Sequence, residues 1–81
     1  MKVYIGSLPK QVNDEELNGL ASQYGTVISA DVIMDRSSGE SKGFGFIEFG
    51  TPEEGRAMIT ALNGSELHGQ VLKLDEAKPR R

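Results

Sequence analysis

Segments with strand-like and helix-like patterns alternate along this chain in a set order, and that order constrains its fold more than any other feature. Four short segments carry the β-branched, aromatic or alternating apolar residues that are typical of half-buried strands. Two longer segments have apolar residues three or four positions apart, which is typical of a helix with one buried face. In chain order the six segments are residues 3–8 (strand), 14–24 (helix), 27–34 (strand), 42–49 (strand), 52–62 (helix) and 71–77 (strand).

Both helical segments begin with recognisable capping residues. Asn13 with Glu16, and Thr51 with Glu54, have the spacing of a capping box, in which each side chain satisfies a backbone N–H of the first turn. Gly25 is the expected C′ residue of the first helix. The residues predicted to face the core are Leu17, Leu20, Ala21 and Tyr24 in the first helix, and Gly55, Met58, Ile59 and Leu62 in the second.

The order βαββαβ predicts an α+β domain of the ferredoxin-like type, which is a four-stranded antiparallel sheet with two helices on one face. A chain of 81 residues has room for one such domain. Because two helices cover only one face of the sheet, the other face is open to solvent. Side chains on that open face must therefore be polar, or must serve a partner.

The composition excludes several classes of protein. The chain has no cysteine, which excludes disulfides, thiolate metal sites and thiol nucleophiles. Its apolar runs are far too short to span a membrane, and the pattern that starts at Met1 leaves no space for a signal peptide. We therefore expect a monomeric cytoplasmic protein that has no membrane contact, no cofactor and no bound metal.

Aromatic residues gather on the predicted open face. Along residues 42–49 alternate side chains point to opposite faces, so Phe44 and Phe46 lie opposite Ile47 and Phe49. One of these pairs is exposed in either orientation, and an exposed apolar patch of this kind marks a binding site. Tyr4 joins Phe44 and Phe46 on the open face, because its neighbours in the first strand are core residues. Three glycines are expected to leave these rings room: Gly6, Gly43 and Gly45.

These residues resemble a known family, the RNA recognition motif (RRM). Residues 42–49, KGFGFIEF, match its octapeptide K/R-G-F/Y-G/A-F-V-x-F/Y, with Ile47 in place of the usual Val. Residues 3–8, VYIGSL, resemble its companion hexapeptide, with Ser7 where Asn is usual. The resemblance implies an RRM domain over residues 1–79, followed by a basic tail of residues 80–81.

The resemblance also implies a mechanism. An RRM binds single-stranded RNA on its sheet by stacking two or three bases on aromatic side chains. By position, Tyr4 and Phe46 would stack successive bases, Phe44 would pack against the sugars, and Lys42 would meet a phosphate. Single-stranded DNA is a second ligand of the same chemistry, and no catalysis is implied. Two further basic residues are expected to contact the nucleic acid, namely Lys73 and Lys78.

The formal net charge of −3 argues against nucleic acid, whose binders are usually basic. Residues 13–25 carry three acids and no base, however, so much of the acidity lies on a helix. Asp31, Glu48 and Asp75 are expected on the open face, where they repel phosphate and limit affinity. Such carboxylates can also accept hydrogen bonds from the exocyclic amines of bases. The simpler interpretation is that they keep an exposed aromatic sheet soluble.

A second hypothesis, from another functional class, is a protein-interaction module that uses the same fold. Such a module would be expected to have lost Tyr4 or Phe46, and both are present. His68, the only histidine, is interpreted as a solvated loop residue because too few ligand types surround it for a zinc site. Residues 78–81 are predicted to swing over bound RNA, with Pro79 ending the strand.

Overall fold

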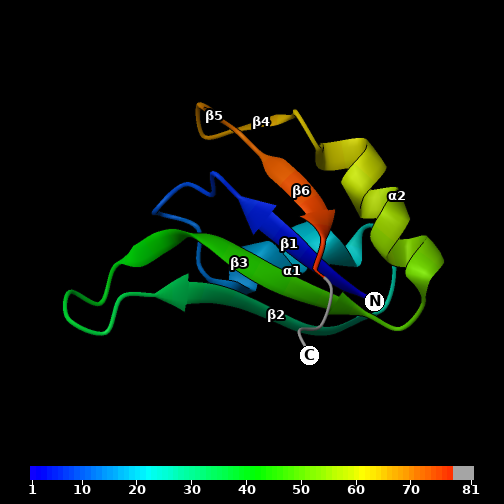
Figure 1. Ribbon diagram of the computed structural model, residues 1–81, viewed down its shortest axis with the longest axis horizontal. Coiled ribbons are helices and arrows are strands. Elements are labelled where there is room, and N and C mark those ends of the chain that lie inside the picture. Colours follow the sequence, from blue (N-terminus) through cyan, green and yellow to red (C-terminus); the bar gives the residue numbers. More distant parts are fainter. Residues whose placement is uncertain (78–81) are drawn as a thin grey trace.

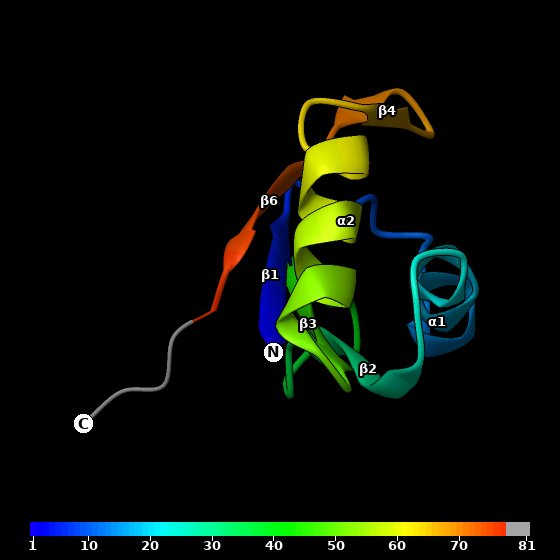
Figure 2. The same ribbon diagram turned by 90° about the vertical axis from the view of Figure 1, so that its right-hand side faces the viewer.

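Four strands form an antiparallel sheet in the order β2-β3-β1-β6, and both helices pack against one of its faces. The computed structural model describes residues 1–77. Figure 2, in which the sheet is seen from its edge, shows α1 and α2 on the same side and, within residues 1–77, no helix or strand on the other. The predicted ferredoxin-like βαββαβ fold is therefore confirmed. The elements are β1 (Lys2–Gly6), α1 (Asp14–Ser22), β2 (Val27–Met34), β3 (Ser41–Phe49), α2 (Pro52–Leu62), β4 (Glu66–Leu67), β5 (Gln70–Val71) and β6 (Lys73–Glu76).

The core lies between the sheet and the helices. Val3 and Ile5 of β1, and Ile47 and Phe49 of β3, are almost completely buried, as the alternation of these strands predicts. Of the residues predicted to face the core, Tyr24, Ile59 and Leu62 are partly buried and pack against it, and Leu20 is also only partly buried. The helical residues that are fully buried are Leu17, Ala21, Gly55 and Met58.

The first helix is shorter than predicted. It ends at Ser22 with Gln23 as C-cap in a right-handed helical conformation, so Gly25 does not act as the left-handed C′ residue. Gly25 instead leaves room for a side chain from α2, since a Cβ atom at this position would collide with the carboxylate of Glu54. The glycine is explained by this close approach between distant parts of the chain.

The predicted strand over residues 71–77 is divided in two. The backbone N–H of Leu72 donates to Ser65 O at 2.8 Å, and Leu72 O accepts from Gly64 N–H at 2.9 Å. These bonds hold Leu72 in the core and turn the preceding residues out of the main sheet. Gln70–Val71 therefore pairs with Glu66–Leu67 in a separate two-stranded hairpin, β4–β5, and only β6 joins β1.

The first capping box is only half formed. The Asn13 side chain accepts from Glu16 N–H at 2.8 Å, as expected. The Glu16 carboxylate instead pairs with His68 Nε2 at 2.8 Å, which links α1 to the turn of the β4–β5 hairpin. His68 is exposed in the hairpin turn, as expected for a solvated loop residue, and in addition contacts a partner on α1. The second capping box, between Thr51 and Glu54, is complete.

Side chains from the helices also reach the outer strands of the sheet. Asp14 Oδ1 in α1 accepts from the backbone N–H of Val32 in β2 at 2.7 Å. Asn63 Oδ1, at the end of α2, accepts from the backbone N–H of Leu74 in β6 at 3.1 Å. Each helix is therefore tied to the edge strand that it covers.

Gly45 in β3 faces the helices, so it does not make room for the aromatic rings as expected. A Cβ atom here would lie 2.6 Å from Asp31 O and 3.3 Å from Leu17 Cδ2. Because the first of these is a backbone atom in a paired strand, we expect Gly45→Ala to destabilise the domain by about 1–3 kcal/mol. Gly19→Ala, at an exposed position in α1 with no atom within 4 Å, is the control. It should stabilise the helix by about 0.5–1 kcal/mol. Equal melting temperatures for the two variants would contradict the packing of α1 on Gly45.

Glu54 connects the start of α2 with the start of β2. Its carboxylate accepts from Thr26 N–H at 2.9 Å and from Thr51 N–H at 3.2 Å. These donors favour the ionised form, so the Thr26 N–H first, followed by Thr51, lowers the pKa of Glu54 below its usual value.

The lowered pKa of Glu54 predicts an acid-dependent loss of stability. A carboxylate whose pKa is lower in the folded state contributes stability above its unfolded pKa, and loses it as the pH falls through the folded value. The melting temperature of Glu54→Gln should therefore lie below that of the wild type near neutral pH, and the difference should shrink on acidification below about pH 4. Glu53→Gln, which removes the same charge one residue away, should show a smaller change. A constant gap between Glu54→Gln and the wild type from pH 7 to pH 3 would refute this role.

Candidate functional site on the open face

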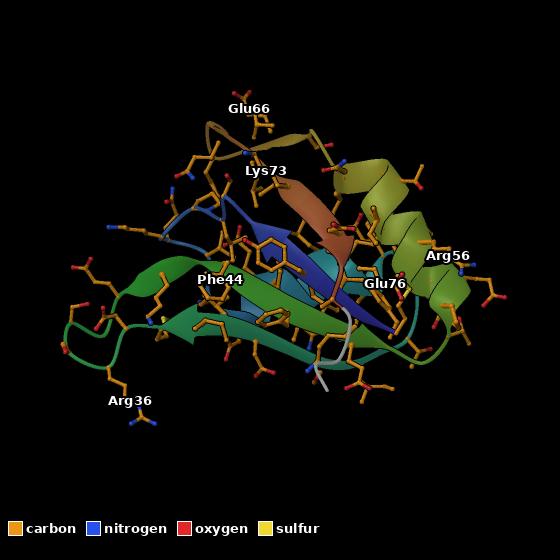
Figure 3. All side chains as sticks on the ribbon, in the orientation of Figure 1. Arg36, Phe44, Arg56, Glu66, Lys73 and Glu76 are labelled. Atoms are coloured by element: carbon orange, nitrogen blue, oxygen red, sulfur yellow. The ribbon has the colours of Figure 1, made fainter. Side chains whose placement is uncertain are left out.

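Tyr4, Phe44 and Phe46 lie together on the face of the sheet that the helices leave uncovered, and we refer to them as the aromatic platform. Tyr4 in β1 is directly opposite Phe46 in β3, and Gly6 is opposite Phe44. The ring centroids are 5.8 Å apart for Tyr4–Phe46, and 6.0 Å apart for both Tyr4–Phe44 and Phe44–Phe46. The three rings therefore form one contiguous apolar surface, and Figure 3 shows Phe44 on β3 within it.

Gly6 allows the Tyr4 ring to lie along the strand. A Cβ atom at Gly6 would be 2.5 Å from Tyr4 Oη and 2.9 Å from the ring, so any side chain there would lift the ring. The expectation that Gly6 makes room for an aromatic ring is confirmed. Ser7, the departure from the hexapeptide, has φ 55°. This left-handed conformation suits the usual Asn, and Ser accepts it here.

The basic residues of the site lie around the platform. Lys42 and Lys73 are both exposed, and Lys42 is two residues before Phe44 in β3. Lys73 is opposite Gly6 at the start of β6 (Figure 3). Sequence reasoning missed Lys2, whose Nζ atom lies 5.7 Å from the centre of the Phe46 ring. Lys2 is two residues before Tyr4, so the alternation that placed Tyr4 on the open face also places Lys2 there. Lys78 lies outside the described residues.

The three acids expected on the open face are also there. Asp31 pairs with Phe46 across β2 and β3, and Asp75 pairs with Tyr4 across β6 and β1. Glu48 is opposite Lys2 and lies two residues after Phe46 in β3. Asp31 and Asp75 are exposed and flank the platform on its two sides.

The described residues 1–77 contain neither a metal-binding cluster nor a membrane-spanning helix. This part of the chain has no group of three or more His, Asp or Glu side chains that could hold a metal ion. None of its helices is both long enough and apolar enough to cross a membrane. The Nε2 atom of His68 contacts the Glu16 carboxylate in α1 and none of the three platform residues.

The model of the RNA recognition motif matches residues 3–73 of this chain. The chain belongs to the RNA recognition motif family. Among curated proteins, it is 42% identical to RbpB of Nostoc sp. over 80 residues, which is 99% of this chain and 78% of that protein. It is also 42% identical to glycine-rich RNA-binding protein 8 of Arabidopsis thaliana, covering 98% of this chain and 47% of that one.

Solved RRM structures have the same architecture. The crystal structure of RNA-binding protein PG1 superimposes with a TM-score of 0.94 at 43% identity, covering 100% of this chain and 98% of that one. The RRM of Rna15 with bound RNA (GU) superimposes with a TM-score of 0.87 at 35% identity, covering 96% and 83% of the two chains. The solved relatives of this RRM thus include one with RNA bound.

Proposed function

We propose that this RRM binds single-stranded RNA on the open face of its sheet, without catalysis. The observation that carries the proposal is the aromatic platform: three rings within 6.0 Å of one another, on the one face of the sheet that no helix covers. A base stacked on an aromatic side chain contributes about 1–3 kcal/mol of binding free energy. Two stacked bases therefore offset the weak electrostatic attraction of an acidic chain.

Each residue has a role in the proposal. Tyr4 and Phe46 stack two successive bases, and Phe44 packs against the sugars between them. Lys42 and Lys73 contact phosphates at the edge of the platform. Lys78, which is not among the described residues, is proposed to contact a further phosphate. Lys2 adds a cation beside the Phe46 ring. PG1 and the Arabidopsis relative are RNA-binding proteins, and the Rna15 RRM was solved with bound RNA, which supports RNA as the ligand.

The proposal also covers the oligomeric state of the protein and a second ligand. We propose that it acts as a monomer, and that single-stranded DNA binds the same platform. A cytoplasmic location stays a prediction, since curated relatives include chloroplastic and mitochondrial proteins.

A chemical-shift titration with short random-sequence single-stranded RNA tests the proposal. We expect the amide and ring signals of Tyr4, Phe44 and Phe46 to move, while those of α1 and α2 remain in place. A duplex of the same length is the control and should cause smaller changes, since its bases are already stacked on one another. Shifts confined to the helices would favour a protein-interaction module instead, and an unchanged spectrum would refute RNA binding.

The salt dependence of binding should be shallow. Two or three of the four lysines proposed for the site, Lys2, Lys42, Lys73 and Lys78, are expected to contact phosphates. Arg36 extends from the β2–β3 loop away from the platform (Figure 3). Each neutralised phosphate contributes about −0.7 to the slope of log K against log salt for a single strand, so we expect a slope of roughly −1.5 to −2. Fluorescence anisotropy between about 50 and 200 mM salt measures it. A slope near −5 would mean that a larger basic surface controls binding.

A further inference from the structure

The two stacking residues lie in one row across the sheet, and a carboxylate stands at each end of that row. Asp31 in β2 pairs with Phe46 in β3, Phe46 pairs with Tyr4 in β1, and Tyr4 pairs with Asp75 in β6. Residues directly opposite in an antiparallel sheet point to the same face, with Cβ atoms about 4.5–5.5 Å apart. The order along the row is therefore acid, ring, ring, acid, all on the open face.

A base stacked on either ring can place its edge beside the neighbouring carboxylate. Adjacent strands are about 4.8 Å apart, which is comparable with the width of a pyrimidine ring, so the edge of a stacked base comes within reach of the next strand. Both acids are exposed, and Asp75 Oδ1 accepts from Glu76 N–H at 2.8 Å, which holds that carboxylate in place. Neither acid forms an ion pair within residues 1–77. Oxygen lone pairs therefore remain available to a ligand.

An ionised carboxylate only accepts hydrogen bonds, and bases differ in what they can donate. Cytosine carries an N4 amine, adenine an N6 amine, and guanine an N2 amine beside its N1–H. Uracil has no amine, and its single N3–H lies between two carbonyl oxygens that repel a carboxylate. A pair of flanking carboxylates therefore distinguishes amine-bearing bases from uracil.

We propose that Asp31 and Asp75 make this RRM select bases with an exocyclic amine and reject uracil at the two stacking positions. The proposal rests on RNA binding by the platform and specifies its ligand. The cations fit the same arrangement, because Lys2 and Lys73 lie in the rows on either side of the acid–ring–ring–acid row. Phosphates can thus meet cations one row away while the bases meet the carboxylates.

The competing explanation is that the two acids only keep an exposed aromatic sheet soluble. Under that explanation the acids repel every RNA equally, and their removal raises the affinity for all sequences by the same factor. Base selection predicts instead that their removal changes the ratio of affinities between sequences. The ratio is therefore the informative quantity, and the absolute affinity is not.

The experiment compares oligocytidine with oligouridine of equal length, since the two bases have the same ring size. Their affinities for the full chain are measured by fluorescence anisotropy at one salt concentration. We expect oligocytidine to bind about tenfold more tightly, because its N4 amine donates to a carboxylate and uracil has no such donor. In the double variant Asp31→Asn and Asp75→Asn the preference should fall to within about twofold, since an amide also donates to the carbonyl oxygens of uracil.

The control double variant, Glu15→Gln with Glu53→Gln, removes the same charge from the two helices. It should leave the preference for oligocytidine unchanged. Equal binding of the two RNAs by the wild type, or a preference that survives in the Asp31 and Asp75 double variant, would overturn base selection while leaving RNA binding intact. If neither RNA binds or shifts the platform signals, the proposed function itself fails, and base selection fails with it.

Discussion

Replacing Phe46 with alanine is expected to weaken RNA binding by about 1–3 kcal/mol while the domain remains folded, and Tyr4→Ala should have a similar effect. Both rings are only partly buried on the open face, and their partners are mainly each other and Phe44. Truncation therefore removes a stacking surface without opening a cavity in the core. Titration of each variant with single-stranded RNA, together with its circular dichroism spectrum, provides the measurement.

The double variant with both rings removed sharpens this test. It should lose more affinity than either single variant, because two stacked bases are lost rather than one. Met34→Ala, which truncates an exposed apolar residue at the far end of β2, is a control that should bind RNA as the wild type does. If the double variant bound RNA with wild-type affinity, the platform would not be the binding site. If either single variant unfolded, the rings would belong to the core.

Phe49→Ala should affect stability and not RNA contacts. We expect it to lower the free energy of unfolding by about 3–5 kcal/mol. Phe49 is in the same strand as Phe46, but it is 1% exposed and is part of the core between β3 and the helices. A domain of this size has a total stability of roughly 0.05–0.15 kcal/mol per residue, so the loss consumes much of it.

Thermal unfolding of Phe49→Ala and Phe46→Ala side by side measures this contrast. The two variants delete the same group from the same strand, three residues apart, and differ only in the face affected. We expect a large fall in melting temperature for Phe49→Ala and a small one for Phe46→Ala. Similar melting temperatures would contradict the assignment of the two residues to opposite faces.

The fold and the platform are predictable from local patterns. Alternation along residues 42–49 distinguishes the faces, because side-chain direction in a strand depends only on position. The order of strands and helices then determines which face is open. Tyr4 and Phe46 meet because β1 and β3 are neighbours in the sheet, and that neighbourhood follows from the topology.

The features that sequence reasoning missed depend on contacts between distant segments. Glu54 reaches back to Thr26, Glu16 turns from its own helix to His68, and Leu72 bonds to Ser65 in place of continuing a strand. In each case a local pattern has two acceptable outcomes, and only the packed fold decides between them. Lys2 is different, because it follows the same alternation as Tyr4 and its place on the open face is therefore predictable from the sequence.

The hydrogen bonds from Asp14 and Asn63 have a consequence for association between molecules. β2 and β6 are the two outer strands of the sheet, and the unpaired N–H groups of an outer strand are a template on which a strand from another molecule can assemble. Asp14 occupies the N–H of Val32, and Asn63 occupies that of Leu74. At each margin a helix thus blocks one position where a foreign strand would begin to pair. The domain can expose an apolar aromatic surface to its ligand while one N–H group on each outer strand is withheld from pairing with another molecule.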